Sequence, residues 1–228
     1  MTRLGAVLSM PGAAHAELLA RRLDFVWIDL EHAALGPAEM QDALVGISAA
    51  GASAYVRVPT GTAPTAALDA GADGIVFPRI RSVAEAESAA AALRHAPDGT
   101  RGYGPRRLAV WPRSSRAACV LQIEDLAGVH AASGIAAVHG VDALVLGAAD
   151  LSFELGEPLA FDTPPMRSAL DAVRCACDET GTSFGIAGMP VEDAIEAAAD
   201  SVVVGVDVRL IDQALAEAIQ SAREALHG

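Results

Sequence analysis

Two apolar runs in the second half of the chain each close on a carboxylate. Residues 118–124 read Ala-Cys-Val-Leu-Gln-Ile-Glu, and residues 143–150 read Ala-Leu-Val-Leu-Gly-Ala-Ala-Asp. Both runs are too short and too continuously apolar for an amphipathic helix, so each predicts a buried strand. Parallel strands lying side by side would bring Glu124 and Asp150 together at one edge of a sheet. This arrangement predicts a divalent-cation site.

The chemistry of these side chains favours a hard cation. Mg²⁺ and Mn²⁺ take oxygen ligands and keep open positions for water or substrate, and Gln122 adds an amide beside Glu124. Taken singly, Glu124 and Asp150 could each instead cap the helix that follows, because aspartate is a favoured N-cap residue. The two acids together favour the metal site.

A second group of polar residues closes two strands in the first half of the chain. Asp29, Glu31 and His32 follow one apolar run, and Arg57 lies between apolar residues in the next. A guanidinium there is costly unless it meets an anion or a polarised oxygen; a structural ion pair with Asp29 or Glu31 is the alternative. His32 follows two acids, which could hold one imidazole nitrogen and leave the other to move a proton.

Eight strand–helix alternations would position these residues. Strands are predicted at residues 4–9, 25–32, 53–59, 74–80, 118–124, 143–151, 183–189 and 201–207, and helices at 14–22, 37–50, 63–70, 82–95, 126–139, 164–180, 190–199 and 211–226. From 97 to 116, prolines, glycines and arginines leave no sustained hydrophobic period, which predicts a long loop.

The alternation predicts an α/β fold, a single (β/α)₈ barrel domain over residues 1–228. A doubly wound open sheet is the alternative, but the segment Ser9-Met-Pro-Gly12 after the first strand lacks the glycine spacing of a dinucleotide loop. In a barrel the carboxyl ends of the strands share one face, where active sites lie. Arg79 and Asp207 also close strands, and we expect them in charge networks at the barrel mouth.

Composition excludes several classes of function. The formal charge of −13 argues against nucleic acid or an anionic membrane as partner. No apolar run approaches the roughly 20 residues of a spanning helix, and the first residues do not resemble a signal peptide, so we expect a soluble, cytoplasmic protein. All 16 basic residues are arginine, which excludes a Schiff-base lysine and pyridoxal phosphate (PLP) held by one. The three cysteines are interpreted as small core hydrophobes.

Six motifs resemble, in order, those of the HpcH/HpaI aldolase family. They are Ile28-Asp-Leu-Glu-His-Ala33, Val56-Arg-Val-Pro59, Gly99-Thr-Arg-Gly-Tyr-Gly104, Gln122-Ile-Glu124, Gly147-Ala-Ala-Asp-Leu-Ser152 and Gly205-Val-Asp207. The resemblance spans almost the whole chain. It implies a (β/α)₈ barrel of the PEP/pyruvate-binding type and a metal-dependent class II aldolase. Such an enzyme cleaves or forms 4-hydroxy-2-oxo acids through a pyruvate enolate.

The resemblance also implies the ligands of the metal and the partners. Glu124 and Asp150 would hold Mg²⁺ or Mn²⁺, with Co²⁺ as a further possibility. The substrates would be a 2-oxo acid, pyruvate or oxaloacetate, and an aldehyde. The protein would be a homo-oligomer, a hexamer or a trimer.

Roles for the remaining site residues follow from the same matching. Arg57 would hold the keto oxygen of pyruvate and its enolate, with Gln122 also on the substrate side. His32, supported by Asp29, would lie in the path of proton transfer. The backbone amides of Ala149 and Asp150 would bind the pyruvate carboxylate.

The chain departs from the family pattern at three places. Leu30 stands where the family usually has glycine, Ala148 stands where it usually has proline, and the loop between Tyr103 and Cys119 is shorter than usual. Two other functions share the implied site: a citrate-synthase-like or acyl-CoA lyase enzyme, and a non-catalytic barrel that binds an anionic metabolite.

Overall fold

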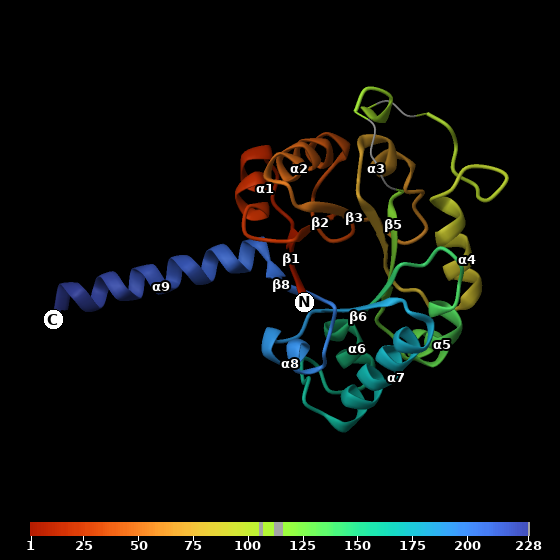
Figure 1. Ribbon diagram of the computed structural model, residues 1–228. Coiled ribbons are helices and arrows are strands. Elements are labelled where there is room, and N and C mark those ends of the chain that lie inside the picture. Colours follow the sequence, from red (N-terminus) through yellow and green to blue (C-terminus); the bar gives the residue numbers. More distant parts are fainter. Residues whose placement is uncertain (105–106, 112–115, 228) are drawn as a thin grey trace.

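The computed structural model describes residues 1–104, 107–111 and 116–227, which form a closed barrel of eight parallel strands in sequential order (Figure 1). The strands are β1 (Arg3–Leu8), β2 (Phe25–Asp29), β3 (Ser53–Arg57), β4 (Gly74–Phe77), β5 (Ala118–Ile123), β6 (Ala143–Gly147), β7 (Ser183–Ala187) and β8 (Ser201–Val206). The predicted (β/α)₈ fold is confirmed, with strands that end one to four residues earlier than predicted.

Helices surround the barrel. They are α1 (Ala13–Ala20), α2 (Pro37–Ala50), α3 (Thr65–Ala70), α4 (Val83–Ala92), α5 (Leu126–Ala136), α6 (Ala148–Glu154), α7 (Pro164–Thr180), α8 (Val191–Glu196) and α9 (Asp207–His227), with a short 3₁₀ turn at Arg107–Ala109. The helix predicted at 211–226 begins earlier, and α9 projects away from the barrel (Figure 1). None of the helices in the described ranges is long and apolar enough to cross a membrane.

One prediction about local structure is wrong. Residues 148–151, expected to extend the sixth strand, instead begin helix α6 directly after Gly147. Their small apolar side chains suit either structure, and Ala148 and Leu151 are buried in the helix as they would be in a strand. Asp150 therefore lies in the first turn of a helix rather than at a strand end.

Parts of the predicted loop at 97–116, residues 105–106 and 112–115, lie outside the described residues.

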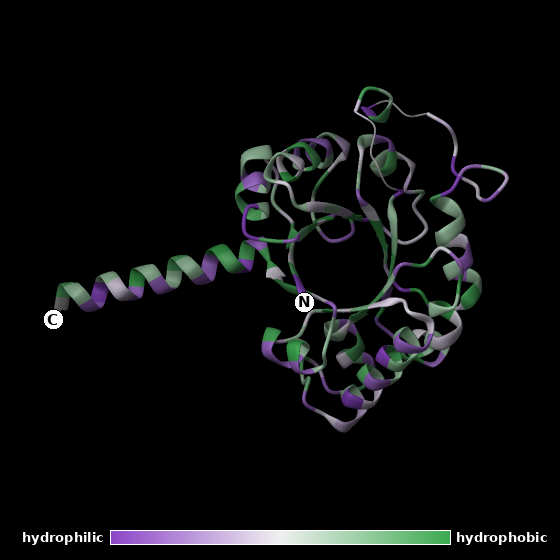
Figure 2. Ribbon diagram, in the orientation of Figure 1, coloured by the Kyte–Doolittle hydropathy of each residue, from purple (hydrophilic) through white to green (hydrophobic). Residues whose placement is uncertain are grey.

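Side chains along each strand point alternately into the barrel and toward the helix layer. Figure 2 shows hydrophobic and hydrophilic residues mixed along the helices around the barrel. Seven apolar residues pack together inside the barrel: Val7, Phe25, Trp27, Val76, Val120, Val145 and Val203. Because side chains on a strand repeat with a period of two, the same inward face continues into Asp29, Arg57 and Gln122. The apolar cluster thus supports a polar layer at the carboxyl ends of the strands.

Two larger apolar clusters lie between the strands and the helices. Cys119 and Cys177 are buried there as predicted, whereas Cys175 is exposed, against the prediction. Helix α4 is capped by Ser82, whose side chain accepts a hydrogen bond from the backbone N–H of Glu85. The helix after β5 is capped by Asp125, whose side chain accepts from Gly128 N at 2.8 Å. Glu124 is therefore released from the capping role that the sequence left open.

Candidate active site

Asp29 and Arg57 form the best-defined pair at the barrel mouth. They are register partners on β2 and β3, and Arg57 donates to Asp29 from Nε at 3.0 Å and from Nη2 at 2.7 Å. The two side chains are only 12% and 4% exposed. A two-pronged bond between buried groups fixes the plane of the guanidinium. The structure therefore contains the ion pair that the sequence offered as the alternative explanation for Arg57.

The pair keeps both groups charged. Burial alone would raise the pKa of Asp29, but hydrogen bonds and charge from Arg57, together with the backbone N–H groups of Glu31 and His32, outweigh burial and lower it. Burial likewise opposes the charge of Arg57, yet Asp29 and Glu31 raise its pKa. Among the described residues, Arg57 Nη1 has no hydrogen-bond acceptor, so the fork retains a donor for a ligand.

His32 lies beside this pair but is not held by Asp29 through its ring. Asp29 accepts from the backbone N–H of His32 at 3.2 Å, while the imidazole Nε2 lies 3.6 Å from Glu31 Oε2. The same Glu31 oxygen lies 3.6 Å from Arg57 Nε. With 59% of its side chain exposed, His32 faces the mouth of the barrel. Glu31, which the sequence offered as a partner for either residue, lies near both the histidine and the arginine.

Glu124 and Gln122 form a second buried group, at the end of β5. Gln122 Nε2 donates to Glu124 Oε2 at 2.7 Å, while Gln122 Oε1 is buried without a hydrogen-bond partner among the described residues. Gly147 allows this approach, because a Cβ there would lie 2.8 Å from Glu124 Cβ and 2.9 Å from Gln122 Nε2. The amide oxygen is left available to a ligand.

Negative charge is concentrated around Glu124. Burial, followed by the charges of Asp150 and Glu31, raises the pKa of this carboxyl to about 7, against smaller opposing effects of Arg79 and Arg57. A carboxyl that is only 4% exposed and has acids as neighbours is destabilised as an anion. An added cation at this position would relieve that strain.

Asp150 joins the group from helix α6, and Arg79 lies between the two acids. Arg79 Nε is 3.8 Å from Glu124 Oε1 and its Nη2 is 3.6 Å from Asp150 Oδ1. One guanidinium within reach of both carboxylates shows that the two acids converge as predicted. Arg79 has a backbone φ of 56°, a left-handed conformation that costs a side-chain-bearing residue about 1 kcal/mol or more. Its charge network was expected from the sequence, but its place on both acids was not.

Asp207 has a structural role at the other side of the barrel. Its buried carboxylate accepts from Ser9 N at 2.9 Å, from Ser9 Oγ at 2.5 Å and from Met10 N at 3.0 Å. His15 Nε2 lies 2.9 Å from it. These bonds join the end of β8 to the loop after β1, which closes the barrel. Asp207 thus lies in a hydrogen-bond network rather than the charge network predicted, and His15 is a partner that the sequence did not indicate.

The donors available to a metal ion are two carboxylates and one amide. Within the described ranges, no group of three or more His, Cys, Asp and Glu side chains could hold a metal ion. One or two carboxylates, completed by water and substrate, are however the protein's usual share of a Mg²⁺ site. Glu124 and Asp150, with Gln122 Oε1 nearby, meet that requirement.

The raised pKa of Glu124 makes a prediction about stability. A folded-state pKa of about 7 against an ordinary 4.5 means that the folded protein binds this proton more tightly than the unfolded chain. In metal-free protein, Glu124 should therefore lower the free energy of unfolding as pH rises from about 4.5 to 7, by roughly 3 kcal/mol in total. Glu124→Gln should remove this slope and be more stable than wild type at pH 8. Denaturant unfolding at several pH values, with exposed Glu87→Gln as control, measures it; parallel curves for wild type and Glu124→Gln would contradict it.

Comparison with known proteins agrees with this geometry. A family model described as HpcH/HpaI aldolase/citrate lyase matches residues 9–214. The hydroxypyruvate/pyruvate aldolase of Rhizorhabdus wittichii is 32% identical over 195 residues, which cover 80% of this chain and 78% of the relative. The 4-hydroxy-4-methyl-2-oxoglutarate aldolase cghB of Chaetomium globosum is 33% identical over 72% of this chain and 66% of the relative, about two thirds of its length.

A solved structure has the same fold over the whole of this chain. The crystal structure of the citrate synthase SbnG superposes with a TM-score of 0.89 and 27% identity, covering all of this chain and 95% of the other. The matched region contains both strand pairs of the barrel mouth described above. The chain belongs to the HpcH/HpaI aldolase/citrate lyase family.

Proposed function

We propose that the protein is a metal-dependent class II aldolase that cleaves or forms 4-hydroxy-2-oxo acids through a pyruvate enolate. The observation that carries the proposal is the arrangement at the barrel mouth. There the fixed guanidinium of Arg57 interacts with the charge of the buried Glu124, and Asp150 converges on Glu124 from the exposed side. Relatives named as oxo-acid aldolases support it.

The chemical difficulty of the reaction is negative charge. Removing a methyl proton from pyruvate, or breaking the carbon–carbon bond in reverse, creates an enolate beside a carboxylate. Glu124 and Asp150 would hold Mg²⁺ or Mn²⁺, with Co²⁺ as an alternative. When bound, this cation would polarise the keto and carboxylate oxygens of the 2-oxo acid. Both the unpaired amide oxygen of Gln122 and the raised pKa of Glu124 fit a cation at this position.

Arg57 would stabilise the developing enolate oxygen. Asp29 holds its guanidinium from one side, so that the remaining Nη1 donor is oriented before the substrate arrives. Preorganised donors of this kind favour the transition state because they need no rearrangement as charge develops. Asp29 would thus act mainly by positioning Arg57.

The other site residues would bind and move protons around this centre. The first-turn backbone N–H groups of Ala149 and Asp150 in α6 are free to bind the pyruvate carboxylate. Gln122 would contact the substrate from β5. His32, which is exposed at the mouth and close to Glu31, would exchange protons with the acceptor aldehyde or its alkoxide.

A second candidate function is carbon–carbon bond formation of the citrate-synthase type. The close superposition on the citrate synthase SbnG favours it, because the same acids and arginine would bind oxaloacetate and stabilise its keto oxygen as the enolate of an acetyl thioester attacks the keto carbon. Retro-aldol assays with 4-hydroxy-2-oxo acids separate the two functions, since cleavage to pyruvate and an aldehyde is expected only of the aldolase. Oxalate resembles the enolate of pyruvate in shape and charge. A protein that binds oxalate but turns over neither a 4-hydroxy-2-oxo acid nor oxaloacetate would be a non-catalytic metabolite-binding barrel.

We also propose that the chain forms a homo-oligomer through α9. Large apolar side chains along this helix are exposed: Val208, Ile211, Leu215, Ile219 and Leu226. They recur mostly three or four residues apart, which places them on one face of a helix that projects from the barrel. Helix α8 precedes β8, and helix α1 follows β1, the neighbour of β8 in the barrel. These two helices carry the exposed Ile195 and Leu18, respectively. A second copy that exchanges α9 would cover both surfaces.

The metal proposal predicts loss of activity without loss of folding. Glu124→Gln and Asp150→Asn should each reduce retro-aldol turnover by roughly 10³-fold or more, because each removes a ligand charge with little change in volume. Excess EDTA should inactivate wild type, and added Mn²⁺ should restore it. Exposed Asp42→Asn is the matched control, and circular dichroism verifies folding. Full turnover in EDTA would contradict the metal site.

The Arg57 proposal predicts an effect on kcat beyond binding. Arg57→Lys keeps the charge but loses the two-pronged bond to Asp29, so turnover of a 4-hydroxy-2-oxo acid should fall by roughly 10²-fold while oxalate affinity is partly retained. Steady-state kinetics and calorimetry measure the two effects, with Arg81→Lys as control. A rise in KM with unchanged kcat would reduce Arg57 to a residue that binds ground state and transition state equally.

The oligomer proposal predicts dissociation when the apolar face of α9 is charged. Leu215→Glu combined with Ile219→Glu should shift the protein to a lower-mass species, because two buried charges at an interface are strongly destabilising. Sedimentation velocity measures the mass, and Gln213→Glu on another face of α9 is the control. An unchanged mass in the double variant, or a monomeric wild type, would contradict the proposal.

A further inference from the structure

Arg79 differs from Arg57 in how loosely it is held. Its nitrogens lie 3.8 Å and 3.6 Å from the oxygens of Glu124 and Asp150, which is longer than a hydrogen bond. Its side chain is 43% exposed. A solvated guanidinium thus balances two acids without being fixed to either.

The backbone of Arg79 has an unusual conformation. Its φ of 56° is unusual for a residue with a side chain, and such residues cluster at functional sites. The next residue, Ile80, donates its backbone N–H to Gln122 O at 3.1 Å. This bond ties the turn after β4 to β5, the strand that Glu124 directly follows. The position of Arg79 is therefore coupled to the acid that it faces.

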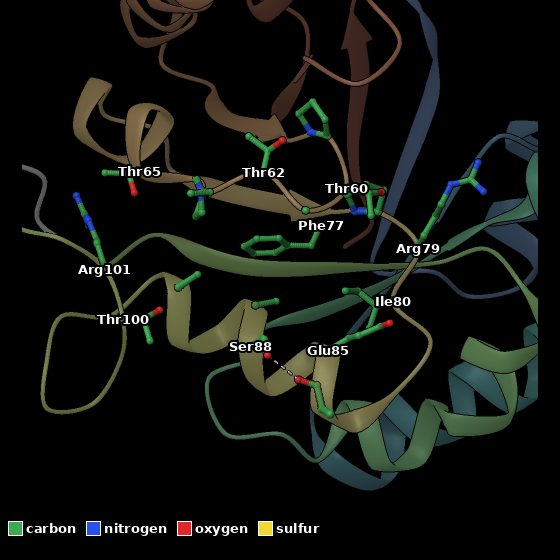
Figure 3. Close-up of a pocket in the computed structure, with 18 residues that line it drawn as sticks. Thr60, Thr62, Thr65, Phe77, Arg79, Ile80, Glu85, Ser88, Thr100 and Arg101 are labelled. Carbon is green, nitrogen blue, oxygen red and sulfur yellow. Dashed lines mark hydrogen bonds between the residues drawn. The ribbon is translucent and has the colours of Figure 1, made fainter.

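The stem of Arg79 lines a cavity of about 610 Å³ between the loop after β3 and helix α4 (Figure 3). Phe77 and Ile80 give the cavity an apolar wall, and Thr60 and Thr62 line it from the β3 side. Figure 3 shows the guanidinium of Arg79 pointing away from Phe77 and Thr60, out of the cavity. The guanidinium of Arg79 thus lies near Glu124 and Asp150, whereas the aliphatic part of its side chain lines the cavity.

The other two charged residues that line the cavity are already occupied. Glu85 accepts a hydrogen bond from the backbone N–H of Arg81 at 2.7 Å, and Arg101 donates to Asp69 at 2.7 Å. Arg79 is thus the charged group of this cavity that is most readily available to a new partner.

We propose that Arg79 is the exchangeable counter-cation of the Glu124–Asp150 pair: a divalent cation displaces its guanidinium, which then binds the second carboxylate of a dicarboxylic 4-hydroxy-2-oxo acid at the edge of the cavity. The proposal rests on the proposed aldolase function and specifies its substrate class. Two carboxylates are balanced by one divalent cation, so a guanidinium beside that ion is repelled. A substrate carboxylate on the cavity side restores the balance through charge-assisted hydrogen bonds.

The first test measures Mn²⁺ binding without substrate. Arg79→Met removes the charge at similar side-chain length and with the same demand on the backbone. Calorimetry on metal-free protein should give a Kd for Mn²⁺ about tenfold lower than that of wild type. Arg81→Met is the matched control, because its guanidinium pairs with Asp125 instead, and it should leave the Kd unchanged. An Arg79→Met affinity equal to that of wild type would overturn the exchange.

The second test compares two substrates at saturating Mn²⁺, 4-hydroxy-2-oxoglutarate and the monocarboxylate 4-hydroxy-2-oxopentanoate. Arg79→Met should lose about 10²-fold in kcat/KM on the dicarboxylate, mainly through KM, and less than about threefold on the monocarboxylate. Equal losses on both would overturn the role in substrate recognition. If wild type cleaves neither compound, the proposed aldolase function fails. If wild type is active and Arg79→Met has the same kinetics as wild type, only the proposal for Arg79 fails.

Discussion

The site depends on negative charge that the fold buries at one end of the barrel. Glu124 is almost fully buried and is repelled by the negative charges of Asp150 and Glu31, so its pKa is raised to about 7. Two arginines offset this charge in different ways. Arg57 is fixed by hydrogen bonds to Asp29, whereas Arg79 lies between Glu124 and Asp150, beyond hydrogen-bond distance of both. A fold that keeps such a cluster forgoes stability, because apolar residues of similar volume would be cheaper to bury. The excess of acid over fixed cation is the physical basis for expecting a cation at this position.

The barrel makes this concentration of charge possible. The period of two along each strand carries the inward face from the apolar cluster of Trp27, Val120 and Val145 to the polar layer above it. Register pairs Asp29 with Arg57, and Gly147 lets β6 approach the side chain of Glu124. The apolar layer excludes water from below, so charges at the mouth interact at a lower dielectric than they would at an open surface.

The sequence predicted the barrel, and which polar residues lie at its mouth, better than it predicted the contacts among them. The alternation of strands and helices specifies a barrel whose strands all end at one mouth, and this was enough to bring Glu124 and Asp150 together there. It was not enough to show that residues 148–151 form a helix, because alanine and leucine suit both structures. Nor could it show that Asp29 would bond the Arg57 side chain rather than the imidazole of His32. The position of Arg79 follows from a left-handed backbone angle, and its sequence neighbours give no signal for one, since neither glycine nor asparagine occupies the turn.

The absence of lysine has a consequence for how the site responds to pH. Every permanent cation at the mouth is an arginine, and a guanidinium stays protonated at any physiological pH. The positive side of the site is therefore constant, while the carboxyl of Glu124 changes charge near pH 7 in the metal-free protein. Metal binding requires that carboxyl in its ionised form, so cation uptake should release a proton below about pH 7 and grow tighter as pH rises. The same burial that makes Glu124 a poor anion on its own makes it a strong ligand once a cation shares its charge.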